Sequence, residues 1–162
     1  MKKYSALFIV ANLIILLAYF NRSVFQKEEI LADGQLLLLA LVPVDPRSLM
    51  QGDYMNLRYA IAEKSNLDTL PRRGFCIVRL DSLGVAQKVR MQSSLTPLET
   101  GEYAINYTAP ENYEILLGAE SYFFQEGEGE KYDKAKYGGL KVDKNGNSLL
   151  VGLYDENKKK IE

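Results

Sequence analysis

The stretch that decides the fold runs from Val44 to Tyr59 and reads VDPRSLMQGDYMNLRY. An Asp-Pro-Arg turn at 45–47 opens it, and Gly52 and Asp53 form a second turn signal. Glycine supplies a backbone with positive φ, and the side chain of aspartate can cap such a turn. The residues that follow alternate between apolar and polar, which is typical of a half-buried strand. The pattern predicts a strand over 53–61 that is entered through a tight turn.

This predicted strand has an apolar face and a polar face, because successive side chains of a strand point to opposite sides. The apolar face consists of Met55, Leu57, Tyr59 and Ile61. The polar face carries a phenol, an amide and a guanidinium, on Tyr54, Asn56 and Arg58. We expect the apolar face to pack into the core, which gives Leu57 and Tyr59 a structural role, as the turn does for Gly52. The polar face suits solvent or a partner.

Further short strand patterns lie on both sides of this stretch. Residues 36–44 (LLLLALVPV) are too few to span a membrane and predict a buried strand. Two hairpins are predicted, each as a pair of strands around a turn: 75–81 with 85–91, and 140–143 with 148–154. Additional strands are expected at 102–107, 114–117 and 121–124, and helical spacing is seen at 128–137.

The fold class that follows is mainly β. Six to eight short strands with frequent turns predict a small β-sandwich or barrel-like domain with one or two short helices. We assign this domain to residues 35–155 and a polar tail to 156–162.

The chain begins with a different kind of segment, the uncharged run ALFIVANLIILLAYF at 6–20 behind Lys2 and Lys3. Counted from Tyr4 to Phe25, a helix of this length reaches roughly 33 Å, enough for a hydrocarbon core of about 30 Å. The alternative is a cleaved signal peptide, but no small-residue cleavage site follows Ala18. We therefore expect an uncleaved transmembrane helix at 1–25 that contacts the lipid bilayer through residues 4–25.

A juxtamembrane segment at 26–34, either short helix or linker, is expected to join this anchor to the β domain. Lysine and arginine are nearly balanced on the two flanks of the anchor, so the positive-inside rule does not orient it. The long hydrophilic domain behind a single short anchor favours an N-terminus in the cytoplasm. The expected location is the bacterial inner (cytoplasmic) membrane, with the C-terminal domain outside the cytoplasm.

Composition excludes most familiar catalytic templates. The 162 residues contain no histidine and a single cysteine, Cys76, so Cys/His zinc sites, histidine-dependent triads and intramolecular disulfides are excluded. No cofactor, no metal and no disulfide-linked partner are expected. The formal net charge of −1 argues against nucleic acid as a partner. Cys76 lies in an apolar strand pattern and is expected to be buried and inert.

The motif stretch resembles the GDYXXLXY family of bacterial membrane-anchored proteins. All five fixed positions of the naming motif are present, as Gly52, Asp53, Tyr54, Leu57 and Tyr59. The Asp-Pro-Arg turn, the run YFFQEG at 122–127 and the hairpin at 142–153 are similar to family features as well. The resemblance gives no biochemical activity, because none is assigned to the family. It implies a single-span protein encoded beside a multi-pass membrane protein, and hence a partner.

From the motif and its surroundings we select candidate partner-binding residues: Asp45, Arg47, Gly52, Asp53, Tyr54, Asn56, Leu57, Arg58, Tyr59, Tyr122 and Glu126. The leading hypothesis is a non-enzymatic accessory or assembly subunit of a multi-pass membrane protein. The alternative is a membrane-tethered hydrolase or carbohydrate-binding domain that uses the carboxylates of Asp45, Asp53 and Glu126.

A similarity to membrane-anchored signal peptidases does not carry over to a catalytic site. Pro46, Leu49 and the Gly-Asp pair at 52–53 are similar to that family's pattern. The nucleophilic serine should stand three residues before the proline, where this chain has Pro43. A serine–lysine dyad needs both partners, so the peptidase interpretation fails at the nucleophile.

Overall fold

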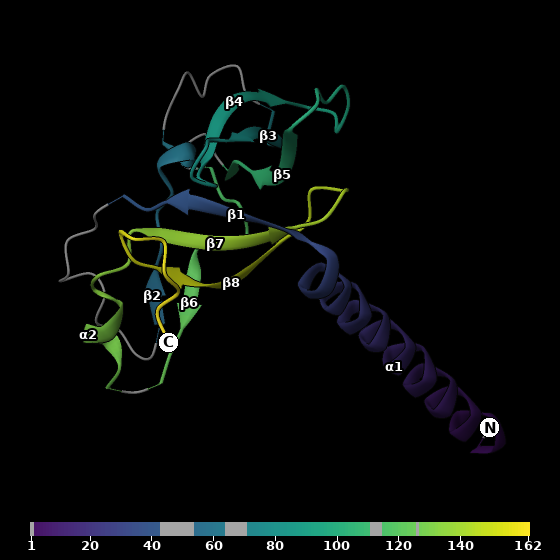
Figure 1. The fold of residues 1–162 in the computed structure, drawn as a ribbon. Coiled ribbons are helices and arrows are strands. Elements are labelled where there is room, and N and C mark those ends of the chain that lie inside the picture. The colour runs from purple at the N-terminus through teal and green to yellow at the C-terminus, as the bar shows by residue number, and fades with distance from the viewer. Residues whose placement is uncertain (1, 43–53, 64–70, 111–114, 126) are drawn as a thin grey trace.

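A long N-terminal helix leads into a β domain in the computed structural model of the chain (Figure 1), which describes residues 2–42, 54–63, 71–110, 115–125 and 127–162. The predicted mainly-β class with an apolar N-terminal helix is confirmed. The described elements, in chain order, are α1 (Lys2–Asp33), β1 (Gln35–Ala40), β2 (Tyr54–Asn56), η2 (Ala60–Ala62), β3 (Arg73–Leu80), β4 (Ala86–Gln92), β5 (Glu102–Thr108), β6 (Ser121–Phe123), α2 (Gly129–Tyr132), β7 (Tyr137–Val142) and β8 (Ser148–Tyr154).

The described strands form three antiparallel sheets, in the orders β1-β7-β8, β4-β3-β5 and β2-β6. The two larger sheets join at two places. On one side the backbone N–H of Leu38 donates to the carbonyl of Gly84 at 3.3 Å, and on the other the N–H of Asn106 donates to the carbonyl of Gly146 at 2.8 Å. Both sheets therefore wrap around one core, which gives the domain its barrel-like character.

The predicted strand over 53–61 is wrong in its length, because the regular strand ends at Asn56. The chain changes partners there. The N–H of Leu57 donates to the carbonyl of Glu120 at 2.7 Å, and the carbonyl of Arg58 accepts from the N–H of Val42 at 2.9 Å. The segment thus begins beside β6 and ends beside the residues after β1.

Buried and exposed side chains still alternate along the motif segment after this change of hydrogen-bond partners. Met55, Leu57, Tyr59 and Ile61 are buried, whereas Asn56 and Arg58 are exposed and Tyr54 is half-buried. The predicted apolar and polar faces are therefore confirmed, although a short η2 helix replaces the last part of the strand.

Other segments differ from the predictions mainly in extent. Both predicted hairpins are present, as β3–β4 and β7–β8. The helix expected over 128–137 is reduced to Gly129–Tyr132, because the chain must already enter β7 at Tyr137. In the strand expected over 114–117, Glu114 lies outside the described residues, and Leu116 forms an isolated bridge with Thr108.

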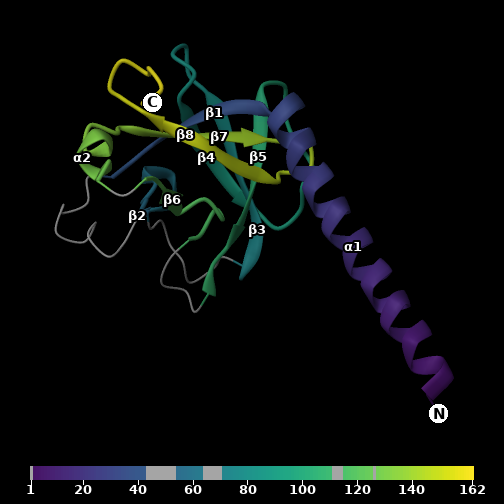
Figure 2. The same ribbon diagram turned by 90° about the horizontal axis from the view of Figure 1, so that it is seen from below.

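Helix α1 extends away from the β domain in both views (Figures 1 and 2). Its segment Leu7–Asp33 is long and apolar enough to cross a membrane: the mean hydropathy of its most apolar 18 residues is 1.8, and none of those residues is buried inside the protein. The helix continues through residues 26–33, where the sequence left helix and linker open. An exposed apolar helix of this length supports a single-pass membrane anchor.

The end of α1 is attached to the β domain by specific contacts. Ile30 is buried, and its carbonyl accepts a hydrogen bond from the N–H of Gly34 at 3.0 Å. The ammonium group of Lys141 on β7 donates to the carbonyls of Leu31 and Ala32 in the last turn of the helix. A cation at a helix C-terminus satisfies free carbonyls and complements the helix dipole. These contacts fix the direction in which the anchor leaves the domain.

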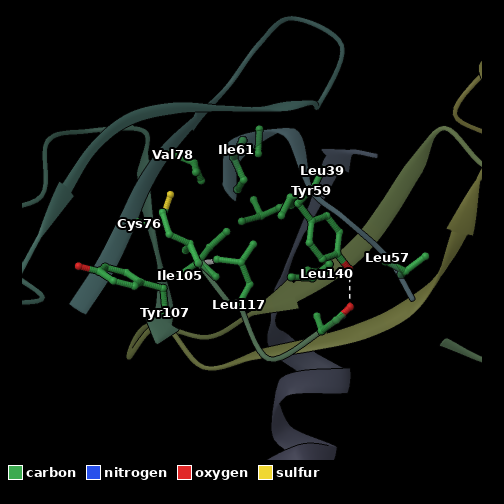
Figure 3. Close-up of a cluster of buried hydrophobic side chains, with 14 of the residues drawn as sticks. Leu39, Leu57, Tyr59, Ile61, Cys76, Val78, Ile105, Tyr107, Leu117 and Leu140 are labelled. Atoms are coloured by element: carbon green, nitrogen blue, oxygen red, sulfur yellow. Dashed lines mark hydrogen bonds between the residues drawn. The ribbon is translucent and has the colours of Figure 1, made fainter. Parts of the chain in front are cut away.

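Tyr59 is part of the buried hydrophobic cluster (Figure 3) and is among its largest fully buried side chains, with 2% of its surface exposed. Its ring lies against β7 at Gly138, where a β-carbon would stand only 2.8 Å from the Cε1 atom of Tyr59. Its hydroxyl donates to the carbonyl of Ala119 at 2.6 Å. Burial, and secondarily the charge of Glu120, raise the pKa of Tyr59, so the phenol remains a protonated donor.

We expect Tyr59→Phe to lower the free energy of unfolding by about 1–3 kcal/mol, because the buried carbonyl of Ala119 loses its donor. Gly138→Ala should also lower the free energy of unfolding by about 1–3 kcal/mol, because the added methyl group must displace the ring. Denaturant unfolding of the full chain in detergent measures both. Gly129→Ala is the control, since its nearest neighbour, Cε2 of Phe124, would lie at 3.7 Å. Equal stability of the Gly138 and Gly129 variants would contradict the role of this contact.

Candidate functional site

Part of the predicted site lies outside the described residues, namely Asp45, Arg47, Gly52, Asp53 and Glu126. The three carboxylates of the hydrolase alternative are all in this group. Their arrangement, and the turn at Gly52, stay predictions from the sequence.

The described part of the site is built on the β2–β6 pair. Its register places Met55 opposite Tyr122 on one face. The other face has Tyr54 opposite Phe123, with ring centroids 5.8 Å apart. The pairing therefore brings Tyr122, which the sequence selected, next to the motif, and it adds Phe123, which the sequence did not. The pattern SYFF indicated a strand but could not indicate its partner, because the pairing is long-range.

The polar face of the motif and Phe123 together form a surface that we call the outer face, made of Tyr54, Asn56, Arg58 and Phe123. Phe123 is 74% exposed, more than any other large hydrophobic side chain among the described residues of the β domain. Asn56 and Arg58 are exposed as well. The outer face thus combines an aromatic pair with an amide and a cation.

The other face of the pair is held by an aromatic cluster. The ring of Tyr132 from α2 lies 5.1 Å from that of Tyr122 and 5.4 Å from that of Phe124, measured between centroids. Burial, followed by the neighbouring Tyr132, raises the pKa of Tyr122 to about 12. Tyr122 is therefore a neutral packing residue, which positions β6 against the core.

The family model described as GDYXXLXY protein matches residues 16–153, most of the chain. The chain belongs to the GDYXXLXY family. No curated protein and no solved structure matches this chain.

In this GDYXXLXY protein the naming motif has two parts with different surroundings. Leu57 and Tyr59 are buried and hold the motif against the segment 115–120. Tyr54 instead supports the exposed ring of Phe123. The motif therefore contributes both to the core and to an exposed surface.

A second cluster of charged residues, which the sequence did not indicate, lies on the β4-β3-β5 sheet. The side chain of Glu102 has no exposed surface. Arg90 donates to both of its carboxylate oxygens, at 2.7 and 2.8 Å, and Arg79 donates to one of them at 3.3 Å. The N–H of Glu99 adds a fourth bond at 3.0 Å. All four hydrogen bonds are accepted by the carboxylate of Glu102 and favour its ionised form. We call Glu102 with Arg79 and Arg90 the clamp, because it holds the loop before β5.

Cys76 and the described acidic residues offer little for catalysis. Cys76 is 1% exposed, and burial raises the pKa of its thiol to about 12, which confirms the predicted buried cysteine. A thiol in that state is a poor nucleophile at neutral pH. Among the described residues, no group of three or more Cys, Asp or Glu side chains is placed to hold a metal ion.

The hydrogen bonds from Arg90 are the main cause that lowers the pKa of Glu102 to about 2, from an ordinary value of 4.5. The ionised carboxylate therefore stabilises the fold fully above about pH 4.5, and this contribution is lost as the pH falls towards 2. We expect Glu102→Gln to be less stable than the wild type at pH 7 and nearly equal at pH 2. Denaturant midpoints at pH 7, 4 and 2 measure the difference.

The control for this prediction is Glu99→Gln, which removes an exposed partner of Arg79 but keeps the backbone N–H that bonds Glu102. Exposed ion pairs contribute little, so its stability should follow that of the wild type at each pH. A constant difference between Glu102→Gln and the wild type down to pH 2 would show that the carboxylate's charge is not what stabilises the loop.

Proposed function

We propose that this protein is a non-enzymatic accessory or assembly subunit of a multi-pass membrane protein. It holds its β domain at the extracytoplasmic face of the bacterial inner membrane. The observation that carries the proposal is the outer face: a strongly exposed phenylalanine whose ring lies 5.8 Å from that of the motif tyrosine, on the side of the motif segment that also presents Arg58. Exposed Phe, Tyr and Arg side chains are the types that most often anchor protein–protein interfaces.

The helix supports a location of the partner close to the membrane. Arg22 is the first charged residue after the uncharged run, and from there to Asp33 the helix advances about 17 Å. Lys141 and Ile30 fix the domain at the end of this helical stalk. A partner that contacts the outer face must therefore extend beyond the lipid surface, as the connecting loops of a multi-pass protein do.

The chemistry of the outer face indicates what such a loop contributes. Arg58 favours a carboxylate, and the ring pair of Tyr54 and Phe123 favours an apolar or aromatic side chain. The partner segment that fits best carries an acidic residue near an apolar one.

We expect the double variant Arg58→Ala/Phe123→Ala to recover at least tenfold less of the multi-pass partner than the wild type, after extraction in mild detergent. Both side chains are exposed, so the unfolding midpoint should change little. Leu83→Ala is the matched control: Leu83 is 62% exposed and lies in the β3–β4 turn. Equal recovery of the partner with the double variant, or a wild-type chain recovered alone, would contradict the proposal.

The proposed topology makes a separate prediction. A cysteine introduced as Lys144→Cys, in the exposed β7–β8 turn, should react with a membrane-impermeant maleimide once the outer membrane is opened and the inner membrane is intact. The wild type supplies the background, since Cys76 is buried. Labelling that requires disruption of the inner membrane would place the domain in the cytoplasm.

A further inference from the structure

Asn12 lies in the middle of the uncharged part of α1. Lys3 and Arg22 bound this run, and Asn12 stands nine residues after the first and ten before the second. When residues 4–25 span a bilayer, Asn12 lies within about 4 Å of its midplane. Polar side chains at that depth are unfavourable unless another polar group meets them.

The helix itself satisfies only part of the Asn12 carboxamide. Its nitrogen donates one hydrogen bond to the carbonyl of Phe8 at 3.0 Å. A carboxamide has a second N–H and an oxygen that accepts. The apolar segment of α1 is fully exposed, and the contacts with the β domain described above lie at the far end of the helix, at Ile30. The remaining donor and acceptor therefore face the hydrocarbon in a single copy of the chain.

We propose that two copies of this chain associate in the membrane through the face of α1 that has Asn12 at its centre. A carboxamide carries both a donor and an acceptor, so two of them complement each other. Two copies inserted in the same way are parallel, and a two-fold axis along the membrane normal places both Asn12 side chains at the same depth. A different helix would need its own polar group at the midplane, whereas a second copy always has one.

The position of the other residues on the helix agrees with this face. At 100° per residue, Leu16, Tyr19 and Ser23 project within about 40° of Asn12. A second asparagine, Asn21, projects on the opposite side and makes the same kind of bond, to the carbonyl of Leu17 at 2.8 Å. Asn21 stands next to Arg22 at the end of the run, where water and headgroups satisfy it. Asn12 cannot reach water or headgroups. A membrane anchor does not require a polar residue at this depth, and association through Asn12 gives that residue a role.

The test uses the full chain in liposomes, labelled on a cysteine introduced as Lys144→Cys, with energy transfer measured against the protein-to-lipid ratio. We expect Asn12→Leu to weaken self-association about three- to twentyfold, the range found for hydrogen bonds between membrane helices. Asn12→Gln, which keeps the carboxamide, should retain most of it. Asn21→Leu is the matched control and should associate like the wild type.

Cysteine cross-linking locates the face independently. Under mild oxidation in membranes, Leu16→Cys should form dimers, whereas Ile14→Cys, on the opposite side of the helix from Asn12, should not. Absence of energy transfer at every ratio, equal association of Asn12→Leu and the wild type, or equal cross-linking at both positions would overturn the proposal. So would an Asn12-dependent complex with a different membrane protein in place of the dimer. The inference does not rest on the accessory function proposed above.

Discussion

The burial of Tyr59 against Gly138 is the contact on which the domain depends. The ring approaches β7 so closely that a β-carbon at position 138 would displace it, and the hydroxyl reaches across to the segment before β6. The backbone at Tyr59 also bridges to Leu41, just after β1. Through its side chain and its backbone, this one residue thus joins three parts of the chain that are far apart in sequence. Because an unpaired buried carbonyl is costly, this geometry also fixes the register of the neighbouring segments.

The faces of the motif strand could be predicted from the sequence because side-chain alternation is a local property. Residues 55–61 alternate, and the structure buries the apolar set as expected. The hairpins were predictable for the same reason, since each turn lies between its own strands. The length of the motif strand was not predictable in this way. It depends on backbone hydrogen bonds that the residues after Asn56 form with Glu120 and Val42, which are distant in sequence. Local patterns carry no information on such partners.

The same distinction explains what was missed at the candidate site. Phe123 becomes part of the outer face only because β6 pairs with β2. The clamp around Glu102 needs Arg79 and Arg90 from two other strands, and each of these residues alone is an ordinary charge on a strand. Both features arise from the sheet topology. The sequence indicated the residue types present, and pairing decided which of them meet.

The division of the family motif affects how substitutions in it are to be interpreted. Leu57 and Tyr59 are buried, so a loss of function after their replacement reports first on folding. Tyr54 contacts both the fold and the exposed Phe123, and its replacement mixes the two effects. Arg58 and Phe123 project outward, so their replacement changes the surface with little change in packing. The proposed binding of a partner by this domain is therefore best tested through residues that the family name does not include.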